Sequence, residues 1–376
     1  MFSVLVLAAG VAYRCWPRPL PFPPAGAPGV TISQGRFLVR MPTQVLLAQV
    51  SAYPDELTAY LYFDYLRSRR EVARSSVLLS VAQQSDSPEY CLLLAVPNDL
   101  LQAEPYLGEL IRQGYIPGFE LQFSNLDDLA RRHEQTRRIQ AAFHRSVRDP
   151  MPDAPASELL YPVSRFVNFK SSVDSRTRLG LQPGLTRLSS SQSDAMAADI
   201  IAVAKFYSLP LDFFLGIGAM ENNYLDVNGD VGNFTWKRRA EKGDIVLQRR
   251  RHKVLVWNYS LGPWQITRET LRHAHQLYLR DRRDYSLLPA HLRPPRGLDL
   301  DQVDSAVLTT YAGLLFRDLL DRFDGDVQKA VGAYNGGRRR PNPRYAAGVT
   351  AVADYARQIL QARASRAEVV SAGQLP

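Results

Sequence analysis

The sequence predicts an α+β protein in which a small α+β unit precedes a mainly α-helical domain. Residues 30–147 alternate short apolar runs typical of strands with stretches of helical periodicity. From residue 193 to about residue 362, apolar positions recur at helical spacing and strand signals are scarce. The chain has 376 residues, of which 45% are hydrophobic and 22% charged, so it can form two or three domains with sizeable cores.

Residues 1–29 are expected to be a signal or anchor segment followed by a spacer. Residues 2–13 form an apolar run that is too short for a typical spanning helix but suits the core of a signal peptide. Residues 17–28 hold six prolines and therefore predict an extended spacer. We expect an exported protein of the periplasm or cell envelope, whose first 12 residues are either cleaved or kept as a membrane tether.

Residues 30–147 carry no recognisable chemical motif. Strands are expected over 76–82, 90–96 and 119–123, and helices over 55–74, 98–113 and 126–147. We expect a solvated surface over an ordinary core here, with binding to a cell-envelope protein as the alternative.

Two further segments are expected to lie outside the folded domains. Residues 148–192 are rich in Pro, Ser and Asp, which predicts a linker or boundary region, with packing of residues 159–169 on a neighbouring element as the alternative. Ser193 is expected to cap the first helix of a domain that spans residues 193–362. Residues 363–376 are expected to form a disordered tail.

The net charge of +9 favours anionic partners, but no nucleic-acid-binding module is recognisable, so nucleic acid is not expected as a partner. Cys15 and Cys91 are the only cysteines, which makes a disulfide framework improbable. No Cys/His cluster has metal-ligand spacing, and we expect neither a metal nor a cofactor.

Residues 209–223 are the stretch in which chemistry is expected. An apolar run at helical spacing ends there in a single acid, Glu221, followed by Asn222 and Asn223. A carboxyl group beside so much apolar sequence loses solvation, which raises its pKa and makes it a candidate general acid near neutral pH.

Four motifs in order resemble the soluble-lytic-transglycosylase (SLT) family of lysozyme-like domains. They are the Ala-Lys-x-Tyr helix at 204–207 with the helix ending in Glu221, Gly-Pro-Trp-Gln-Ile at 262–266, the helix end at 319–326, and Ala-Tyr-Asn-Gly-Gly at 333–337. The second and fourth correspond to family motifs of the types Gly-Leu-Met-Gln and Ala-Tyr-Asn-x-Gly. Because Glu221 precedes Gln265 by 44 residues and Gln265 precedes Asn335 by 70, the combination is fairly specific.

The resemblance implies a lysozyme-like catalytic domain over residues 193–362 and peptidoglycan as its substrate. Glu221 would act first as acid and then as base in cleaving the bond between N-acetylmuramic acid and N-acetylglucosamine. The substrate's acetamido group would assist, and a 1,6-anhydro ring would close without water.

The resemblance also implies five substrate-binding residues besides Asn222. Gln265 would hydrogen-bond sugar hydroxyl or acetamido groups, and Gly262 would allow close backbone approach. Trp264 would either stack on a sugar or pack in the core, and core packing is the expectation. Tyr334 would donate to Glu221 or the acetamido group, and Asn335 would fix the sugar or end its helix.

The chain departs from the family pattern in two places. Asn222 stands where the family has Ser, so the role of that position is open. A long Arg- and Lys-rich insertion follows, and it predicts either a positive rim of the cleft or a solvated loop.

Two other functions remain open on the same scaffold. A hydrolase like the goose-type lysozymes would need a second group to position water, with Glu241 or Asp244 as candidates. A non-catalytic wall-binding scaffold is the other alternative, although an acid in an apolar stretch is costly unless it is used.

Overall fold

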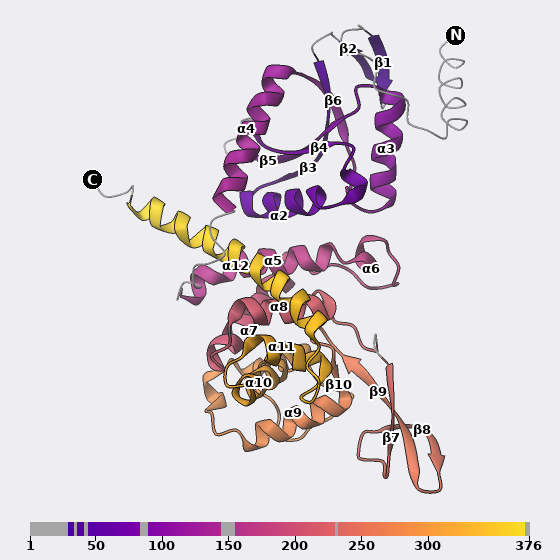
Figure 1. The fold of residues 1–376 in the computed structure, drawn as a ribbon, viewed down its shortest axis with the longest axis vertical. Helices are drawn as coiled ribbons and strands as arrows, with labels where there is room; N and C mark the ends of the chain where they lie inside the picture. Colours follow the sequence, from indigo (N-terminus) through magenta and orange to yellow (C-terminus); the bar gives the residue numbers. More distant parts are fainter. Residues whose placement is uncertain are drawn as a thin grey trace. The chain divides into compact units, whose positions relative to one another are not determined.

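The computed structural model describes residues 29–33, 36–40, 44–82, 89–143, 155–229 and 232–372, so the expectations for residues 1–28 lie outside the described residues. The chain divides into two compact units, which are considered separately below (Figure 1). Unit 1 comprises Met1–His144 and Arg178–Leu181, and unit 2 comprises Arg145–Thr177 and Gln182–Pro376.

Unit 1 contains two antiparallel sheets. The first pairs β1 (Gly29–Ser33) with β2 (Arg36–Arg40). The second has four strands in the order β4-β5-β3-β6, namely β3 (Gln44–Tyr53), β4 (Ser76–Ala82), β5 (Glu89–Val96) and β6 (Glu120–Asn125). Leu47, Leu78 and Leu93 are fully buried on this sheet beside the free thiol of Cys91.

Helices alternate with these strands, as the sequence predicts. They are α2 (Glu56–Arg67), α3 (Leu100–Arg112) and α4 (Leu126–Phe143), with a short 3-10 turn, η1 (Arg70–Val72), before β4. Asp55 and Asp99 begin the first two helices, because their side chains accept from backbone N–H groups that no helical carbonyl can reach. The expected α+β class of the chain is confirmed.

Unit 2 is mainly helical and contains one small sheet. Its helices are α5 (Ala156–Ser172), α6 (Ser175–Arg178), α7 (Ser190–Phe206), α8 (Leu211–Asn222), α9 (Arg268–Arg280), α10 (Ser305–Arg322), α11 (Val327–Gly336) and α12 (Pro343–Ala372), with 3-10 turns η2 (Tyr285–Leu287) and η3 (Ala290–Leu292).

Helix α8 is mostly buried within unit 2, as its largely apolar sequence requires. Gly216 and Gly218 permit the close packing around it: a Cβ on Gly216 would lie 2.8 Å from the Val349 carbonyl of α12, and one on Gly218 would lie 2.5 Å from the Tyr224 ring. The Tyr224 hydroxyl donates to the Leu215 carbonyl at 2.6 Å, which holds the chain back against the helix it has just left. The apolar run at 209–223 is therefore a buried helix.

The expected linker over 148–192 is wrong for much of its length. Helix α5 occupies Ala156–Ser172, and Val163, Phe166 and Val167 of this helix belong to the core of unit 2. The Pro- and Ser-rich composition obscured the helix, since Pro162 lies inside it.

The long insertion after Glu221 is an antiparallel sheet, which the scarcity of strand signals had not predicted. Its strands are β7 (Gly232–Lys237), β8 (Ile245–Arg250), β9 (Lys253–Leu261) and β10 (Ile266–Thr267). β9 is central, with β7 on one side and β8 on the other, and the three extend away from the helices (Figure 1). We call β7, β8 and β9 the arm.

The ends of the helical domain also differ from the prediction. Helix α7 is capped by Ser189, which forms a reciprocal capping box with Gln192, and Ser193 is buried within the helix. Helix α12 continues to Ala372, into the expected disordered tail. In the described ranges, we find no helix with the length and apolar character needed to cross a membrane.

Candidate active site

The last turn of helix α8 lies at the candidate site, and carboxyl groups lie near both ends of the helix. Its first turn carries Asp212, which is buried and accepts a hydrogen bond from Arg357 Nε of α12 at 2.9 Å. Its last turn carries Glu221, and Asn223 stops the helix in the left-handed conformation with φ 48°. The carboxyl group of Glu221 is thus fixed at the end of a buried helix.

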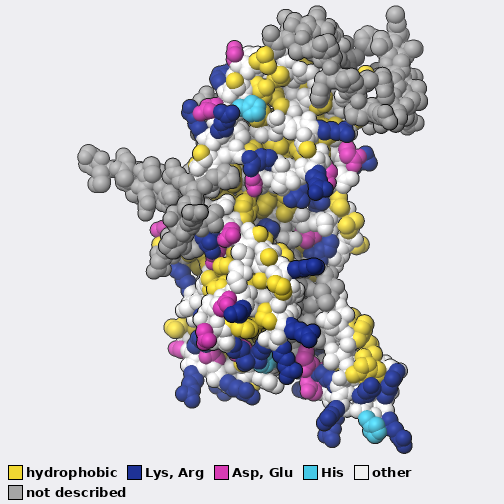
Figure 2. All heavy atoms as spheres, viewed as in Figure 1, with side chains coloured by type: hydrophobic (Ala, Val, Ile, Leu, Met, Phe, Trp, Pro, Cys, Tyr) yellow, Lys and Arg dark blue, Asp and Glu magenta, His cyan; other side chains and the backbone are white. Residues whose placement is uncertain are grey.

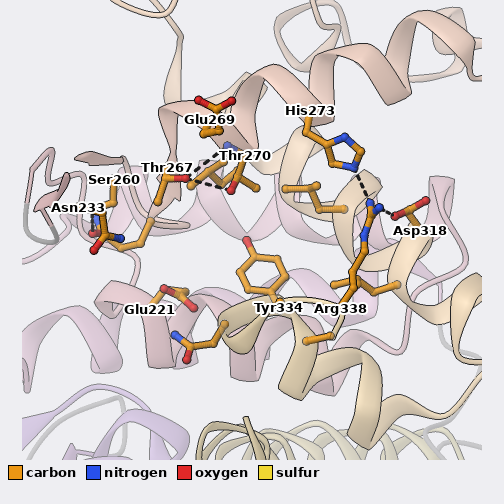
Figure 3. A pocket seen from close by; sticks show the side chains of 17 residues that line it. Glu221, Asn233, Ser260, Thr267, Glu269, Thr270, His273, Asp318, Tyr334 and Arg338 are labelled. Atoms are coloured by element: carbon orange, nitrogen blue, oxygen red, sulfur yellow. Dashed lines mark hydrogen bonds and ion pairs between the residues drawn. The ribbon is translucent and has the colours of Figure 1, made fainter. Parts of the chain in front are cut away.

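The carboxyl group faces a cleft of about 440 Å³ (Figure 3). Side chains from α8, the β7–β10 sheet, α9, α10 and α11 line it, so segments 117 residues apart in the chain, from Glu221 to Arg338, meet there. Ser260, Thr267 and Thr270 contribute hydroxyl groups, and Leu315 and Leu319 contribute apolar surface. Such a mixture of polar and apolar groups is suited to a polar ligand with flat apolar faces.

The environment of Glu221 disfavours its charged form. Burial raises its pKa to about 7, even though a hydrogen bond from the Tyr345 hydroxyl to Oε1 at 2.6 Å acts in the opposite direction. Burial raises the pKa of Tyr345 far above its ordinary value, and the neighbouring charge of Glu221 and the hydrogen bond to it raise it further. Glu221 is therefore an acid that exchanges a proton near neutral pH, as the apolar sequence around it predicts.

Tyr345 is a site residue that sequence reasoning missed. It lies in the first turn of α12, 124 residues from Glu221, and no motif marks it. Tyr334, which was predicted, lines the cleft beside Glu221, and its hydroxyl donates to the Trp264 carbonyl at 3.4 Å. Burial and the nearby Glu221 raise the pKa of Tyr334, so its hydroxyl stays protonated and can only donate or accept hydrogen bonds.

The turn at 262–265 brings three predicted residues to different places. Gly262 is buried with φ 63°, and its N–H donates to Asn228 Oδ1 at 2.9 Å, so it shapes the turn and does not line the cleft. Trp264 is fully buried, stacks on Phe214 with ring centroids 4.4 Å apart, and donates to Thr309 Oγ1 at 2.9 Å. The expectation that Trp264 packs in the core is confirmed.

Gln265 lines the cleft, and its side-chain amide is hydrogen-bonded to other groups of the protein. Its Nε2 donates to the carbonyls of Val227 at 2.9 Å and Gly262 at 2.8 Å, and its Oε1 accepts from Ser260 Oγ. Because both N–H bonds are used, the remaining capacity of Gln265 is one lone pair on Oε1, which can accept from a ligand hydroxyl or amide.

The two predicted asparagines differ. Asn335 lines the cleft, and its Oδ1 accepts from Asn342 Nδ2 at 2.9 Å, so this bond does not use its own N–H₂ donors. Asn222 is 3% exposed, and its amide is engaged by Arg176 and by the Leu225 carbonyl at 2.9 Å. The expected ligand contact of Asn222 is therefore wrong: it fastens the end of α8 to the following loop.

Further polar side chains in the cleft were not predicted. Arg338 donates to Asp318 Oδ2 at 2.9 Å and contacts His273 Nε2 at one end (Figure 3). Burial and Arg338 lower the pKa of His273, so it stays neutral near pH 7. Glu269 of α9 lies on the wall that faces α8 and is paired with Lys237 at 2.5 Å.

The carboxylates proposed for positioning water are elsewhere. Asp244 is paired with Arg272 at 2.7 Å and Lys237 at 3.3 Å, and Glu241 joins the same ion-pair network. Neither residue lines the cleft. Within the described part of the chain, no group of His, Cys, Asp and Glu side chains is arranged to hold a metal ion.

Comparison with protein families, curated proteins and solved structures finds no match for this chain.

Proposed function

We propose that unit 2 is a peptidoglycan lytic transglycosylase with a lysozyme-like catalytic domain. The observation that carries the proposal is a single carboxyl group, Glu221, whose pKa is raised to about 7 and which opens onto a cleft suited to sugars. The order of the SLT-type motifs supports it, since Glu221, Gln265, Tyr334 and Asn335 meet around that cleft.

Glu221 would carry out both proton transfers. As the neutral acid it donates its proton to the glycosidic oxygen between N-acetylmuramic acid and N-acetylglucosamine, and the C1–O bond breaks. The muramic acid's acetamido oxygen stabilises the electron-poor C1. The Glu221 carboxylate then takes the proton of the C6 hydroxyl, O6 bonds to C1, and a 1,6-anhydro end forms with the acid regenerated. A pKa of about 7 suits a group that must give and regain a proton.

The neighbouring side chains would hold the sugar and the acid. Tyr345 fixes the carboxyl through its hydrogen bond to Oε1 and leaves the other oxygen for the substrate. Gln265 would accept from a sugar N–H or hydroxyl through its remaining lone pair, and Asn335 would donate to a sugar oxygen. Tyr334 lines the same cleft and would hydrogen-bond the acetamido group.

An enzyme of this kind works where peptidoglycan is, so we place the protein in the periplasm or cell envelope. Residues 1–29 would direct export or tether the chain to the membrane. Residues 30–147, most of which belong to unit 1, would bind a cell-envelope protein.

Hydrolysis is the second candidate, and Glu269 is the observation that favours it. Glu269 lines the cleft on the wall facing Glu221, where a carboxylate could position water for attack at C1. Its pairing with Lys237 at 2.5 Å and Arg272 at 3.3 Å competes with that role. We therefore prefer the transglycosylase mechanism, in which the substrate's acetamido group takes the place of a second carboxylate.

Mass spectrometry of muropeptides released from purified peptidoglycan tests the proposal. The wild type should release anhydro-muropeptides, and Glu221→Gln should release none, because the amide cannot donate the proton. Glu269→Gln is the matched control: it has the same substitution in the same cleft and should still give anhydro products. Reducing-end products that vanish in Glu269→Gln would make the enzyme a hydrolase. No products from the wild type, with wall binding intact, would favour a scaffold.

A further inference from the structure

The arm has one packed face and one open face. On the packed face Val254 and Val256 are buried, and Asn233 of the neighbouring strand lines the cleft. Successive side chains of a strand point to opposite faces, so Phe234 and Trp236 lie on the reverse side of the sheet from the cleft. They are 62% and 37% exposed, whereas the largest side chains of the core are fully buried.

Aromatic and aliphatic side chains extend across the open face. The register of β7 on β9 places Phe234 opposite Trp257 and Trp236 opposite Leu255. Leu247 of β8, at the irregularity in that strand, is 51% exposed. Figure 2 shows hydrophobic side chains gathered along this part of the molecule. Exposed aromatic rings of this size on a soluble domain mark a binding surface.

The outer end of the arm is basic and has no acidic counterpart. Residues 245–253 contain Arg249, Arg250, Arg251 and Lys253 and no Asp or Glu. Arg250 and Lys253 lie over the Trp236 ring, at 4.9 and 4.8 Å from its centroid. The structure records no ion pair for these four cations within its described residues, so their charge remains available to an anionic partner.

We propose that this open face, comprising Phe234, Trp236, Leu247, Leu255, Trp257 and the cations Arg250, Arg251 and Lys253 at its outer end, is a second site that binds peptidoglycan strands. The inference rests on the proposed function for the identity of its ligand. Aromatic rings pack against the C–H faces of pyranose sugars, and the cations pair with the carboxylates of the peptide stems.

The arrangement along the arm argues against insertion into a membrane. Inserted segments carry their apolar side chains deepest and their cations at the headgroup level. In the arm the order is reversed, because the cations occupy the extreme turn and the aromatic rings lie nearer the base. A polymer with sugar rings and spaced carboxylates matches that order better.

A second site on the reverse face would act without competing for the cleft. A strand held on the arm keeps other strands of the same sacculus at a high effective concentration near Glu221. The function of the arm is therefore to retain the enzyme on an insoluble polymer.

Sedimentation with purified insoluble sacculi tests the inference in a Glu221→Gln background, where binding is measured without cleavage. Phe234→Ala/Trp236→Ala should weaken binding by at least about tenfold. Arg250→Gln/Arg251→Gln should weaken it and flatten its dependence on salt. Leu279→Ala, which removes a side chain that is 58% exposed on α9, is the matched control and should bind like the parent. Cooperative thermal melting of each variant shows that it is folded.

Four outcomes separate the two proposals. Arm variants that bind as tightly as Leu279→Ala would overturn the inference, whatever the enzymatic activity. Binding to vesicles of anionic lipid but not to sacculi would also overturn it and assign the arm to membranes. Wild-type protein that binds sacculi through the arm but releases no muropeptides would leave the inference standing and remove the proposed function. If Phe234→Ala/Trp236→Ala neither binds nor melts cooperatively, Arg250→Gln/Arg251→Gln decides, because it changes only exposed side chains: folded protein with unchanged binding overturns the inference, and folded protein with weakened binding supports it.

Discussion

The carboxyl group of Glu221 is subject to two opposing influences. Burial at the end of α8 raises its pKa, and the hydrogen bond from Tyr345 lowers it, with a pKa of about 7 as the result. A general acid is active only when protonated, so the reaction rate should fall as the pH rises through about 7.

Tyr345→Phe should move that limb of the pH profile to higher pH. The substitution removes the hydrogen bond at 2.6 Å that stabilises the carboxylate, so desolvation acts unopposed and the pKa of Glu221 rises further. The maximal rate should drop by about tenfold or less, since one hydrogen bond is lost and the acid remains. Rates measured from pH 5 to pH 9 on both proteins check this, and an unmoved limb would remove Tyr345 from the site.

The raised pKa of Glu221 should lower the stability of the folded protein at and above neutral pH. The unfolded chain releases the proton near the ordinary pKa of 4.5 and the folded chain near 7, so the free energy of unfolding declines as pH rises between those values. Below pH 4.5 both states are protonated and the cost vanishes. Glu221→Gln has no proton to lose, so at pH 8 it should be more stable than the wild type by up to about 3 kcal/mol.

Urea denaturation of the two proteins at pH 4 and pH 8 measures this difference. The gap between them should be larger at pH 8. A gap of equal size at both pH values would mean that the Glu221 carboxyl group is not desolvated in the folded protein.

Site residues could be predicted from sequence only where a local pattern marks them. Glu221 ends an apolar run, so both its helix and its raised pKa were predictable. Consecutive residues of a helix point about 100° apart, so Asn222, although adjacent, turns into the core while Glu221 faces the cleft. Tyr345 and Glu269 reach the site because α12 and α9 happen to pass it, and a single sequence does not contain that information.

At the scale of elements, composition misled the prediction twice. Helix α5 was predicted as a linker because prolines and serines surround it. The insertion that forms the arm was predicted to be either a rim of the cleft or a solvated loop. Its strands were not predicted because its cations hid the alternation of residues 253–257, in which Val254 and Val256 are buried and Leu255 and Trp257 are more exposed. When the buried and the exposed positions of a strand are both apolar, the sequence shows no alternation of apolar and polar residues.

The turn between β9 and β10 contains a glycine at which any side chain would be strained. Gly262 has φ 63°, and a Cβ there would come within 2.5 Å of Leu308 Cδ1 of α10. Gly262→Ala should destabilise the protein by about 1–3 kcal/mol and reduce activity, because the same turn holds Gln265 in the cleft. Gly297→Ala is the control, since nothing lies within 4 Å of its added methyl group, and its thermal melting and activity should match the wild type. Equal effects at both glycines would contradict this account.

At the scale of the whole molecule, the position of α5 decides what the catalytic unit is. Four of its side chains, Leu159, Val163, Phe166 and Val167, are buried in the core of unit 2. Burying a side chain of this kind contributes about 1.5–3 kcal/mol, so together they approach the entire net stability of a domain, about 5–15 kcal/mol. A domain cut at the start of the motif region, near residue 190, therefore lacks a necessary part of its core.

Two truncations test this directly. A fragment of residues 155–376 retains α5 and the whole core of unit 2, so it should unfold cooperatively and release the same products as the full chain. A fragment of residues 182–376 lacks only α5 and α6 and should fail to melt cooperatively, with exposed apolar surface that binds hydrophobic dyes. Phe166→Ala in the full chain should cost about 3–5 kcal/mol by the same mechanism without removing any backbone. If the shorter fragment proves as stable as the longer one, α5 is an appendage and the predicted boundary near residue 193 was correct.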